Sequence, residues 1–404
     1  MDINPERLVV VCSIHSHRVA TTVADLHPVS GEQVIAHKAV ECPWAELSEK
    51  SRKEAISESV RLAADSAGIE VHSLFLSRSD TSFHSRLEQG WLELGEEVTI
   101  DATTREWALR KAREKGTAAD SEVIDALPVA WTVRTNAGDR EVEDPVGEKG
   151  RGLTCQALVV TARRGYRAEL AGLARSLGWE LDGVIAQPVA LYRGMANSLP
   201  KSGSTLVFDL GGRHTTVLIR VKQQLNHLET FEFGGDDLTR RIADSLDLSY
   251  EAAEALKLQV DIASISETNQ AAGQQVIWTD LQEADVRRHK AARICAEGMR
   301  SFLADRARDL RESGHLGQRG HVYLVGRAAG MAGMVPVAKD IFDLPVALGT
   351  GDRHRNPGDE MDNLLITGQV RVAAALRREQ ILIHGTSIAS KAGGVWNWLT
   401  KRFD

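Results

Sequence analysis

The sequence predicts an α/β fold with two lobes, a small α+β insert and an amphipathic helix at the C-terminal end. Strands rich in β-branched residues, each group followed by helices, occur near the N-terminus and again after Ser204. A compact segment with its own strands and helix lies between these groups. The last residues place tryptophans and basic side chains at helical spacing. These three observations define the predicted organisation.

The first lobe is expected to begin with two strands joined by a tight turn, because apolar and β-branched residues over 8–26 are interrupted by polar ones from Ser13 to Arg18. Helical periodicity predicts a helix over 52–67, which ends before Gly68. The chain then forms a strand over 71–76. It returns to this lobe with a helix over 166–177 and a strand over 183–186.

The insert is predicted to contain a helix over 103–115 and strands over 97–100, 130–134 and 153–161. The polar, Gly/Pro-rich stretch between the last two strands is expected to be an exposed loop.

The second lobe opens with a nearly continuous apolar run over 204–210, which is typical of a strand buried on both faces. The other predicted strands are 215–221, 228–233 and 322–325. The predicted helices are 237–245, 250–258, about 280–311, one ending near Phe342, and 361–376. A linker is expected after this last helix.

Composition excludes several classes of protein. The net charge of −7 argues against a general nucleic-acid binder, which needs a basic face. No apolar stretch approaches the length of a spanning helix, and the acidic, proline-containing N-terminus is unlike a signal peptide. The four cysteines, Cys12, Cys42, Cys155 and Cys295, lack metal-ligand spacing and favour a reducing compartment.

Glycine turns follow three predicted strands. Glycines in FDLGGRHTTV, at 208–217, let backbone N–H groups approach a phosphate, and the aspartate can hold a metal-bound water. Taken alone, this motif is more typical of an ordinary hairpin. GGDDLTRRIADSL at 234–246 and LVGRAAGMAGM at 324–334 add two strand-to-helix turns, whose helix N-termini favour anions.

This order of turns, with AEALK at 253–257, resembles the superfamily of actin, Hsp70 and hexokinase, whose fold is ribonuclease H-like. Within it, the chain is most similar to the bacterial cell-division family FtsA. EDPVGEKGRGLTCQALVVTA at 143–162 resembles that family's NPVG loop and the strand after it. GVWNWLTKRFD at 394–404 resembles its membrane-targeting helix.

The resemblance implies a domain organisation. Residues 1–83, 163–202 and 361–378 would form the first actin-like lobe, 84–162 the insert subdomain used in filaments, and 203–360 the second lobe, with 236–318 as its outer subdomain. Residues 379–392 would be a linker and 393–404 the membrane-targeting helix. The implied partners are the tubulin-like protein FtsZ, membrane lipid and further copies of the chain, at the division site on the inner face of the cytoplasmic membrane.

The resemblance also implies an ATP site, with Mg²⁺, between the lobes. The matching positions are the first turn with Ser13, Ser16 and Arg18, and the second turn with Asp209, Gly211, Gly212 and Arg213. The nucleoside side is represented by Gly234, Gly235, Glu254, Lys257, Gly326 and Arg327.

Departures from the family pattern lie at the phosphate positions. The first turn lacks the family's acid and glycine, and Arg213, His214 and Arg327 replace small residues of the other two motifs. In one interpretation the site is lost and the arginines pair with nearby acids. In the other, Arg18, Arg213 and Arg327 bind phosphates directly. Both predict slow or absent hydrolysis.

Three histidines, His15, His17 and His214, are expected to face the cleft. A three-histidine metal site is the less favoured alternative to solvated or hydrogen-bonded side chains. Protonation of these histidines would raise nucleotide affinity below about pH 6.5.

The last residues predict a membrane-binding helix. With about 100° per residue, Val395, Trp396, Trp398, Leu399 and Phe403 share one face. Lys401 and Arg402 would attract anionic lipid at about 1 kcal/mol each. The alternative is a helix docked on the protein itself or on another subunit.

The favoured hypothesis is therefore a membrane adaptor that binds a tubulin-like polymer and self-associates. The rival is a cytoplasmic platform protein of the PilM type, from a pilus or secretion system. A metabolic kinase of the same superfamily would need an intact first phosphate turn and a catalytic acid, and the sequence offers neither.

Overall fold

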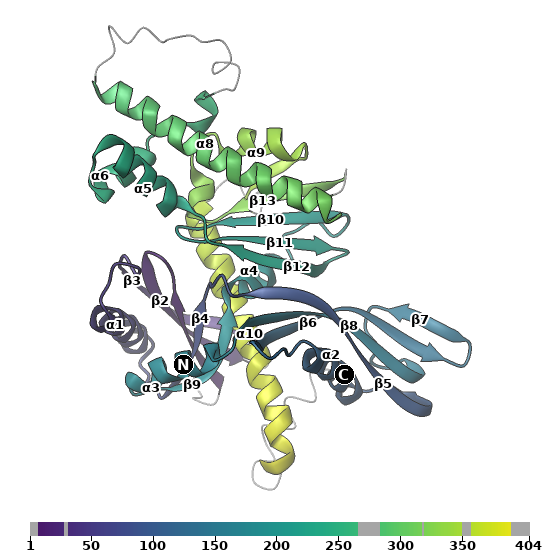
Figure 1. Cartoon of the computed structure of the whole chain (residues 1–404). Coiled ribbons are helices and arrows are strands. Elements are labelled where there is room, and N and C mark those ends of the chain that lie inside the picture. Colours follow the sequence, from purple (N-terminus) through teal and green to yellow (C-terminus); the bar gives the residue numbers. More distant parts are fainter. Residues whose placement is uncertain (1–6, 28–30, 266–282, 317–318, 350–356, 389–404) are drawn as a thin grey trace.

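The computed structural model describes residues 7–27, 31–265, 283–316, 319–349 and 357–388. Two sheets organise the chain (Figure 1). The first has five strands in the order β3-β2-β1-β4-β9. Their bounds are β1 Leu8–Ile14, β2 Arg18–His27, β3 Gly31–Glu41, β4 Ser73–Arg78 and β9 Glu180–Ala186. The predicted strand, polar turn and strand at the N-terminus are confirmed as the antiparallel pair β1 and β2.

Helices cover this first sheet and complete the first lobe. They are α1 Glu49–Ala67, α3 Tyr166–Ser176, α4 Gln187–Met195 and α10 Pro357–Ile388. Helix α1 starts where Ser48 accepts a hydrogen bond from the Ser51 backbone N–H at 3.1 Å. Valines of the sheet, with Ile56 and Phe75, form the core beneath the helices.

Helices α4 and α10 approach each other unusually closely. A Cβ added at Gly194 would lie 1.9 Å from the Leu364 carbonyl oxygen, and one at Gly368 only 1.7 Å from the Ala190 oxygen. Only glycine fits at these two crossing points. Helix α10, yellow in Figure 1, therefore runs against α4 on its way past both lobes.

The insert consists of helix α2 on a strongly twisted sheet. The elements are β5 His84–Thr99, α2 Ala102–Lys115, β6 Ser121–Thr135, β7 Gly138–Val142 and β8 Lys149–Arg163. Asp101 caps α2 by accepting from the Thr104 N–H at 2.7 Å. Strand β5 passes directly beneath α2 at Gly90, where a Cβ would meet the helix backbone at 2.2 Å.

The second lobe has five strands with helices on one side. Its elements are β10 Ser204–Leu210, β11 Thr215–Val221, β12 Gln224–Phe231, α5 Gly235–Leu246, α6 Tyr250–Lys257, η2 Ile262–Ser264, α8 Glu283–Glu312, β13 Gly320–Val325, η4 Arg327–Gly330, α9 Met334–Phe342 and β14 Val346–Leu348. Beneath these helices the sheet forms a core of its own, which includes Phe208 packed on Phe342 at 5.0 Å between ring centroids. Val207, Leu218 and Val325 belong instead to the core that also contains the first lobe.

The insert and the second lobe share one continuous sheet. Its nine strands run β14-β13-β10-β11-β12-β5-β8-β6-β7. The junction is short, because β12 pairs with β5 only at Glu229 and His84. The Ser85 hydroxyl extends the ladder by donating to the Leu228 carbonyl and accepting from the Leu228 N–H, both at 2.8 Å. No sequence pattern predicted this connection.

Several predicted boundaries differ from the structure. Strand β7 lies within the predicted exposed loop, because residues 131–135 pair with 138–142 across a tight turn. The predicted linker is helical as far as Ile388, as part of α10. Strand β5 extends far beyond the predicted 97–100, since pairing with β8 stabilises a polar, exposed strand. No helix in the described part of the chain is long and apolar enough to cross a bilayer.

Candidate nucleotide cleft

Three turns that the sequence singled out meet between the lobes. The β1–β2 turn comes from the first lobe, and the β10–β11 turn comes from the second. The third turn, Gly234–Gly235, begins helix α5. Backbone hydrogen bonds fix the last two together, from the Gly235 N–H to the Gly211 oxygen at 3.0 Å and from the Asp236 N–H to the Gly212 oxygen at 2.8 Å.

The glycines at these turns allow backbones to touch. A Cβ at Gly234 would lie 2.2 Å from the Gly212 carbonyl oxygen, so a side chain there would separate the turns. The Gly234 N–H is bonded to an Asp237 carboxylate oxygen at 2.9 Å. The first N–H groups of α5, which would attract an anion at an open helix N-terminus, therefore already have partners within the chain.

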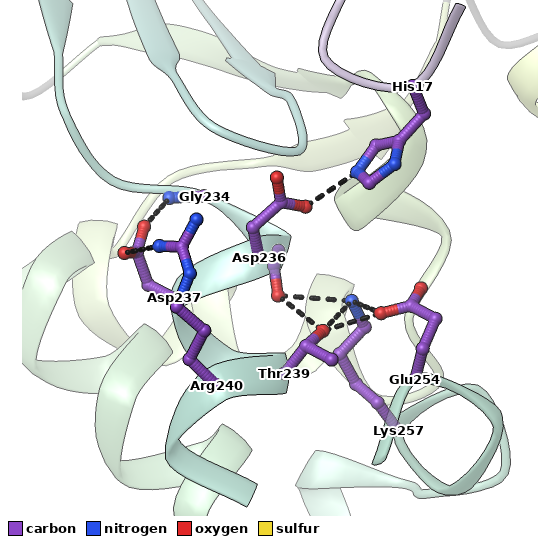
Figure 2. A network of polar contacts seen from close by, with 9 residues as sticks. His17, Gly234, Asp236, Asp237, Thr239, Arg240, Glu254 and Lys257 are labelled. Atoms are coloured by element: carbon purple, nitrogen blue, oxygen red, sulfur yellow. Dashed lines mark hydrogen bonds and ion pairs between the residues drawn. The ribbon is translucent and has the colours of Figure 1, made fainter. Parts of the chain in front are cut away.

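A side-chain contact joins the two lobes across this site. His17 Nε2 lies 2.7 Å from Asp236 Oδ1, and Figure 2 shows the imidazole reaching from the β1–β2 turn to the start of α5. The hydrogen bond to Asp236 raises the pKa of His17. Burial alone would raise the pKa of Asp236, but the hydrogen bond and charge of His17 lower it. Each partner thus favours the charged form of the other.

The first turn rests on a buried polar cluster. The Ser13 hydroxyl lies 2.8 Å from His15 Nε2 and accepts hydrogen bonds from the Gln187 amide at 3.0 Å and the Gln369 amide at 2.8 Å. Because these two amides fill both acceptor positions, the single Ser13 O–H donates to His15 Nε2. Burial lowers the pKa of His15 to about 3, in agreement with a neutral imidazole that accepts this bond. A neutral, fully bonded hydroxyl thus occupies the position of the family's acid.

Each of the three cleft arginines pairs with an acid. Arg18 binds both carboxylate oxygens of Asp362 on α10. Arg213 lies 3.5 Å from a Glu232 oxygen, and Arg327 lies 3.9 Å from a Glu41 oxygen across the lobes. The last two pairs are exposed and long, so they are weak, whereas the Arg18 pair is bidentate and half-buried. These pairs agree with the interpretation in which the arginines bind acidic side chains of the chain itself.

On the nucleoside side, Lys257 is engaged in a compact network (Figure 2). Its ammonium donates to the Gly235 oxygen at 3.0 Å, the Thr239 hydroxyl at 2.8 Å and Glu254 Oε2 at 2.6 Å. Only 7% of Lys257 is exposed, so these bonds replace the water it loses. Glu254 and Lys257 therefore lie together, as the sequence predicted, with all three ammonium donors used.

Three further predicted residues lie at the strand ends and turns of the site. Asp209 is the last residue but one of β10, and burial raises the pKa of its carboxyl to about 7. A Cβ at Gly326 would lie 2.6 Å from Asp209 Oδ1, so this glycine lets the β13–η4 turn pass over the aspartate. The Ser16 carbonyl accepts from the Trp44 N–H at 2.9 Å and orients the first turn toward the segment after β3.

A phosphate chain with Mg²⁺ fits these residues poorly. Asp209 has the chemistry of a ligand for a metal-bound water. However, the first N–H groups of α5, Lys257 and the three arginines are bonded within the chain, and His17 occupies the space beside Gly212. Among the residues that the structure describes, no group of three His, Cys, Asp or Glu side chains is arranged to hold a metal ion. His15 and His17 instead contact Ser13 and Asp236.

Sequence reasoning missed Gln187, Gln369, Asp362 and Asp236 as parts of the cleft. Gln187 offered one signal, since it precedes a proline at the start of a helix directly after a strand. Asp236 directly follows the predicted Gly234–Gly235 turn, so the GGDD motif was a signal for it. Asp362 and Gln369 lie on helix α10 far along the chain, and no local pattern marks them. The predicted membrane-binding residues at 395–403 lie outside the described residues.

Comparisons with known proteins agree with this architecture. A family model described as cell division protein FtsA matches residues 206–363. FtsA of Streptococcus pneumoniae is 25% identical over 295 residues, and FtsA of Enterococcus faecalis is 26% identical over 299 residues; each match covers 73% of this chain. The chain is thus similar to FtsA over most of its length.

The matches to FtsA cover 64% of the pneumococcal protein and 67% of the enterococcal one, so the chain spans about two thirds of these relatives. Among solved structures, a chain of the PilM–PilN type IV pilus biogenesis complex superposes with a TM-score of 0.56 at 17% identity, covering 91% of this chain and 98% of that one. This likeness concerns the fold. The predicted two-lobed actin-like fold is confirmed for the FtsA-like chain.

Proposed function

We propose that this FtsA-like chain is a cell-division adaptor on the inner face of the cytoplasmic membrane. It binds an FtsZ-type polymer, self-associates through its actin-like lobes and insert, and contacts lipid through residues 393–404. The similarity to FtsA over 73% of the chain is the observation that carries this proposal. The terminal Trp396, Trp398, Lys401 and Arg402 support the lipid contact by their chemistry.

The cleft acts in this proposal as a scaffold rather than as an ATPase. The internal partners of Lys257, Arg18 and the first N–H groups of α5 support this role. Denatured protein should release no stoichiometric ATP or ADP on chromatography, and Mg·ATP hydrolysis should stay at the background of a buffer control. A copurified nucleotide near one per chain would contradict the scaffold role without affecting the adaptor role.

Co-sedimentation tests the adaptor role directly. The full chain should carry FtsZ into the pellet with anionic liposomes, whereas a chain ending at Ala392 should bind FtsZ but leave it in the supernatant. The double variant Trp396→Ala, Trp398→Ala should weaken pelleting strongly, and the matched change of Trp107→Ala, on the insert helix, should not. Unchanged pelleting after truncation would contradict the membrane contact.

The alternative is a platform protein of the PilM type, favoured by the similarity of fold to the PilM–PilN complex. Such a protein would bind a short peptide of a membrane protein and not FtsZ. Failure to capture FtsZ at micromolar concentrations, together with binding of such a peptide, would favour this alternative.

A further inference from the structure

His17 lies in the β1–β2 turn of the first lobe. Among the hydrogen bonds of the described residues, it is the one first-lobe side chain bonded to Asp236. Asp236 is well placed to receive it, because its backbone N–H is fixed to the Gly212 oxygen and its side chain is only 8% exposed. The pair therefore connects a rigid position in the second lobe to the tip of a hairpin in the first.

His17 also fills space that a ligand would need. A Cβ placed on Gly212 would lie 3.0 Å from His17 Cδ2 and 3.0 Å from Asp236 Oδ1. The imidazole and the carboxylate therefore contact the face of Gly212 that carries no side chain, and a phosphate placed there would overlap them. A phosphate there would also meet the negative charge of Asp236.

The charges around His17 favour its protonated form. Asp236 on α5 and Glu254 on α6 face it and raise its pKa, while Lys257 on α6 lowers it. The remaining charges at the cleft mouth are paired with each other, Arg213 with Glu232 and Arg327 with Glu41. Protonated His17 is therefore attracted to the second lobe by the negative charges of Asp236 and Glu254.

We propose that His17 and Asp236 form an interlobe latch, which holds the cleft closed without nucleotide and occupies the place of a phosphate beside Gly212. Val207, Leu218 and Val325 of the second lobe lie in one buried core with Val189 of α4, so the latch restrains rotation about this shared core. This proposal is independent of the cell-division role, because a chain that fails to bind FtsZ would leave it intact.

Distances between the lobes test the latch. Spin labels at Glu54→Cys on α1 and Glu251→Cys on α6, both exposed, report the opening in full-length protein with Cys42→Ser. Without nucleotide, this chain should give one narrow distance distribution. His17→Ala should raise the ratio of open to closed molecules by about tenfold, as expected when a hydrogen bond to a charged group is lost. His72→Ala, an exposed histidine of the first lobe, is the matched control and should have no effect.

A second variant, Asp236→Asn, tests the latch independently in case His17→Ala fails to fold. Asp236→Asn preserves the size of the side chain and removes its charge, so it should broaden the distance distribution less than His17→Ala. In the parent chain the distribution should broaden as pH rises through the raised pKa of His17. This pH dependence should be absent in Asp236→Asn. Mg·ATP should leave the distribution of the labelled parent chain unchanged. The proposal fails if His17→Ala gives the parent distribution, or if Mg·ATP alone narrows a broad parent distribution.

Discussion

At the residue scale, several polar groups of the cleft are hydrogen-bonded to other residues of the chain, whereas in a phosphate site such groups would be available to the ligand. Ser13 shows this most clearly, because one hydroxyl satisfies two glutamine amides and one histidine. Buried donors and acceptors cost free energy when unpaired, so such clusters specify one arrangement of the turn.

Ser13→Ala should lower the free energy of unfolding by about 1–3 kcal/mol, because it leaves two amide N–H groups and His15 Nε2 without this partner. Denaturant titration measures the loss. Ser176→Ala, an exposed serine at the end of α3, is the control and should change stability by less than about 0.5 kcal/mol. Equal effects of the two changes would show that the Ser13 cluster contributes nothing.

The latch also predicts a pH dependence of stability. The raised pKa of His17 contributes stability that is complete below about pH 6.5, its unfolded value, and is lost as pH rises through the folded value. The lowered pKa of Asp236 contributes stability above about pH 4, which is lost as pH falls further. The difference in melting temperature between the parent chain and His17→Ala should therefore be largest between these limits. A difference independent of pH from 5 to 9 would argue against an ionic latch.

At the element scale, the helix crossings and the caps determine where the cleft residues lie. Helix α10 carries both Asp362 and Gln369, which reach the first turn because α10 packs tightly on α4. This close approach depends on the glycines at the two crossing points.

Gly368→Ala should destabilise the chain by about 3 kcal/mol or more, because the added methyl group would overlap the Ala190 oxygen and separate the helices. Gly172→Ala, in α3, is the matched control. It meets no atom within 4 Å and should stabilise by about 0.5–1 kcal/mol through helix propensity. Thermal and denaturant unfolding should give opposite signs for the two variants, and the same sign would contradict the packing described here.

At the scale of the whole molecule, the two lobes share a buried core, which includes Leu218 and Val325 of the second lobe, and His17 joins them at the cleft. The sheet between the insert and the second lobe adds one residue pair and the Ser85 contact. Relative motion of the lobes is therefore expected to hinge at the shared core and to break the His17 contact.

Ser85→Ala should speed amide hydrogen exchange at Leu228 by about tenfold or more, because this N–H loses its acceptor. The Leu218 amide, in the neighbouring strand of the same sheet, serves as the internal control and should keep its rate. Unchanged exchange at Leu228, measured by mass spectrometry or NMR, would show that the junction does not rely on the hydroxyl.

The sequence by itself determined the two repeats of strand, turn and strand, most of the helices and the glycine turns, because periodicity and turn chemistry are local properties. The order of their motifs predicted Gly211, Gly234 and Lys257 at one site, and the structure brings these three residues close together. It missed β7 and the full length of β5, since their polar residues become strands only by pairing with neighbours.

Only the tertiary structure decided what the cleft side chains bind. His17 meets Asp236 across 219 positions of sequence, Arg18 meets Asp362 across 344, and Ser13 meets Gln369 across 356. Such contacts follow from how two sheets and helix α10 pack, and residue type or spacing along the chain carries no information about them. The sequence could therefore locate a cleft, whereas the fold assigned its arginines, its lysine and one of its histidines to acids within the chain.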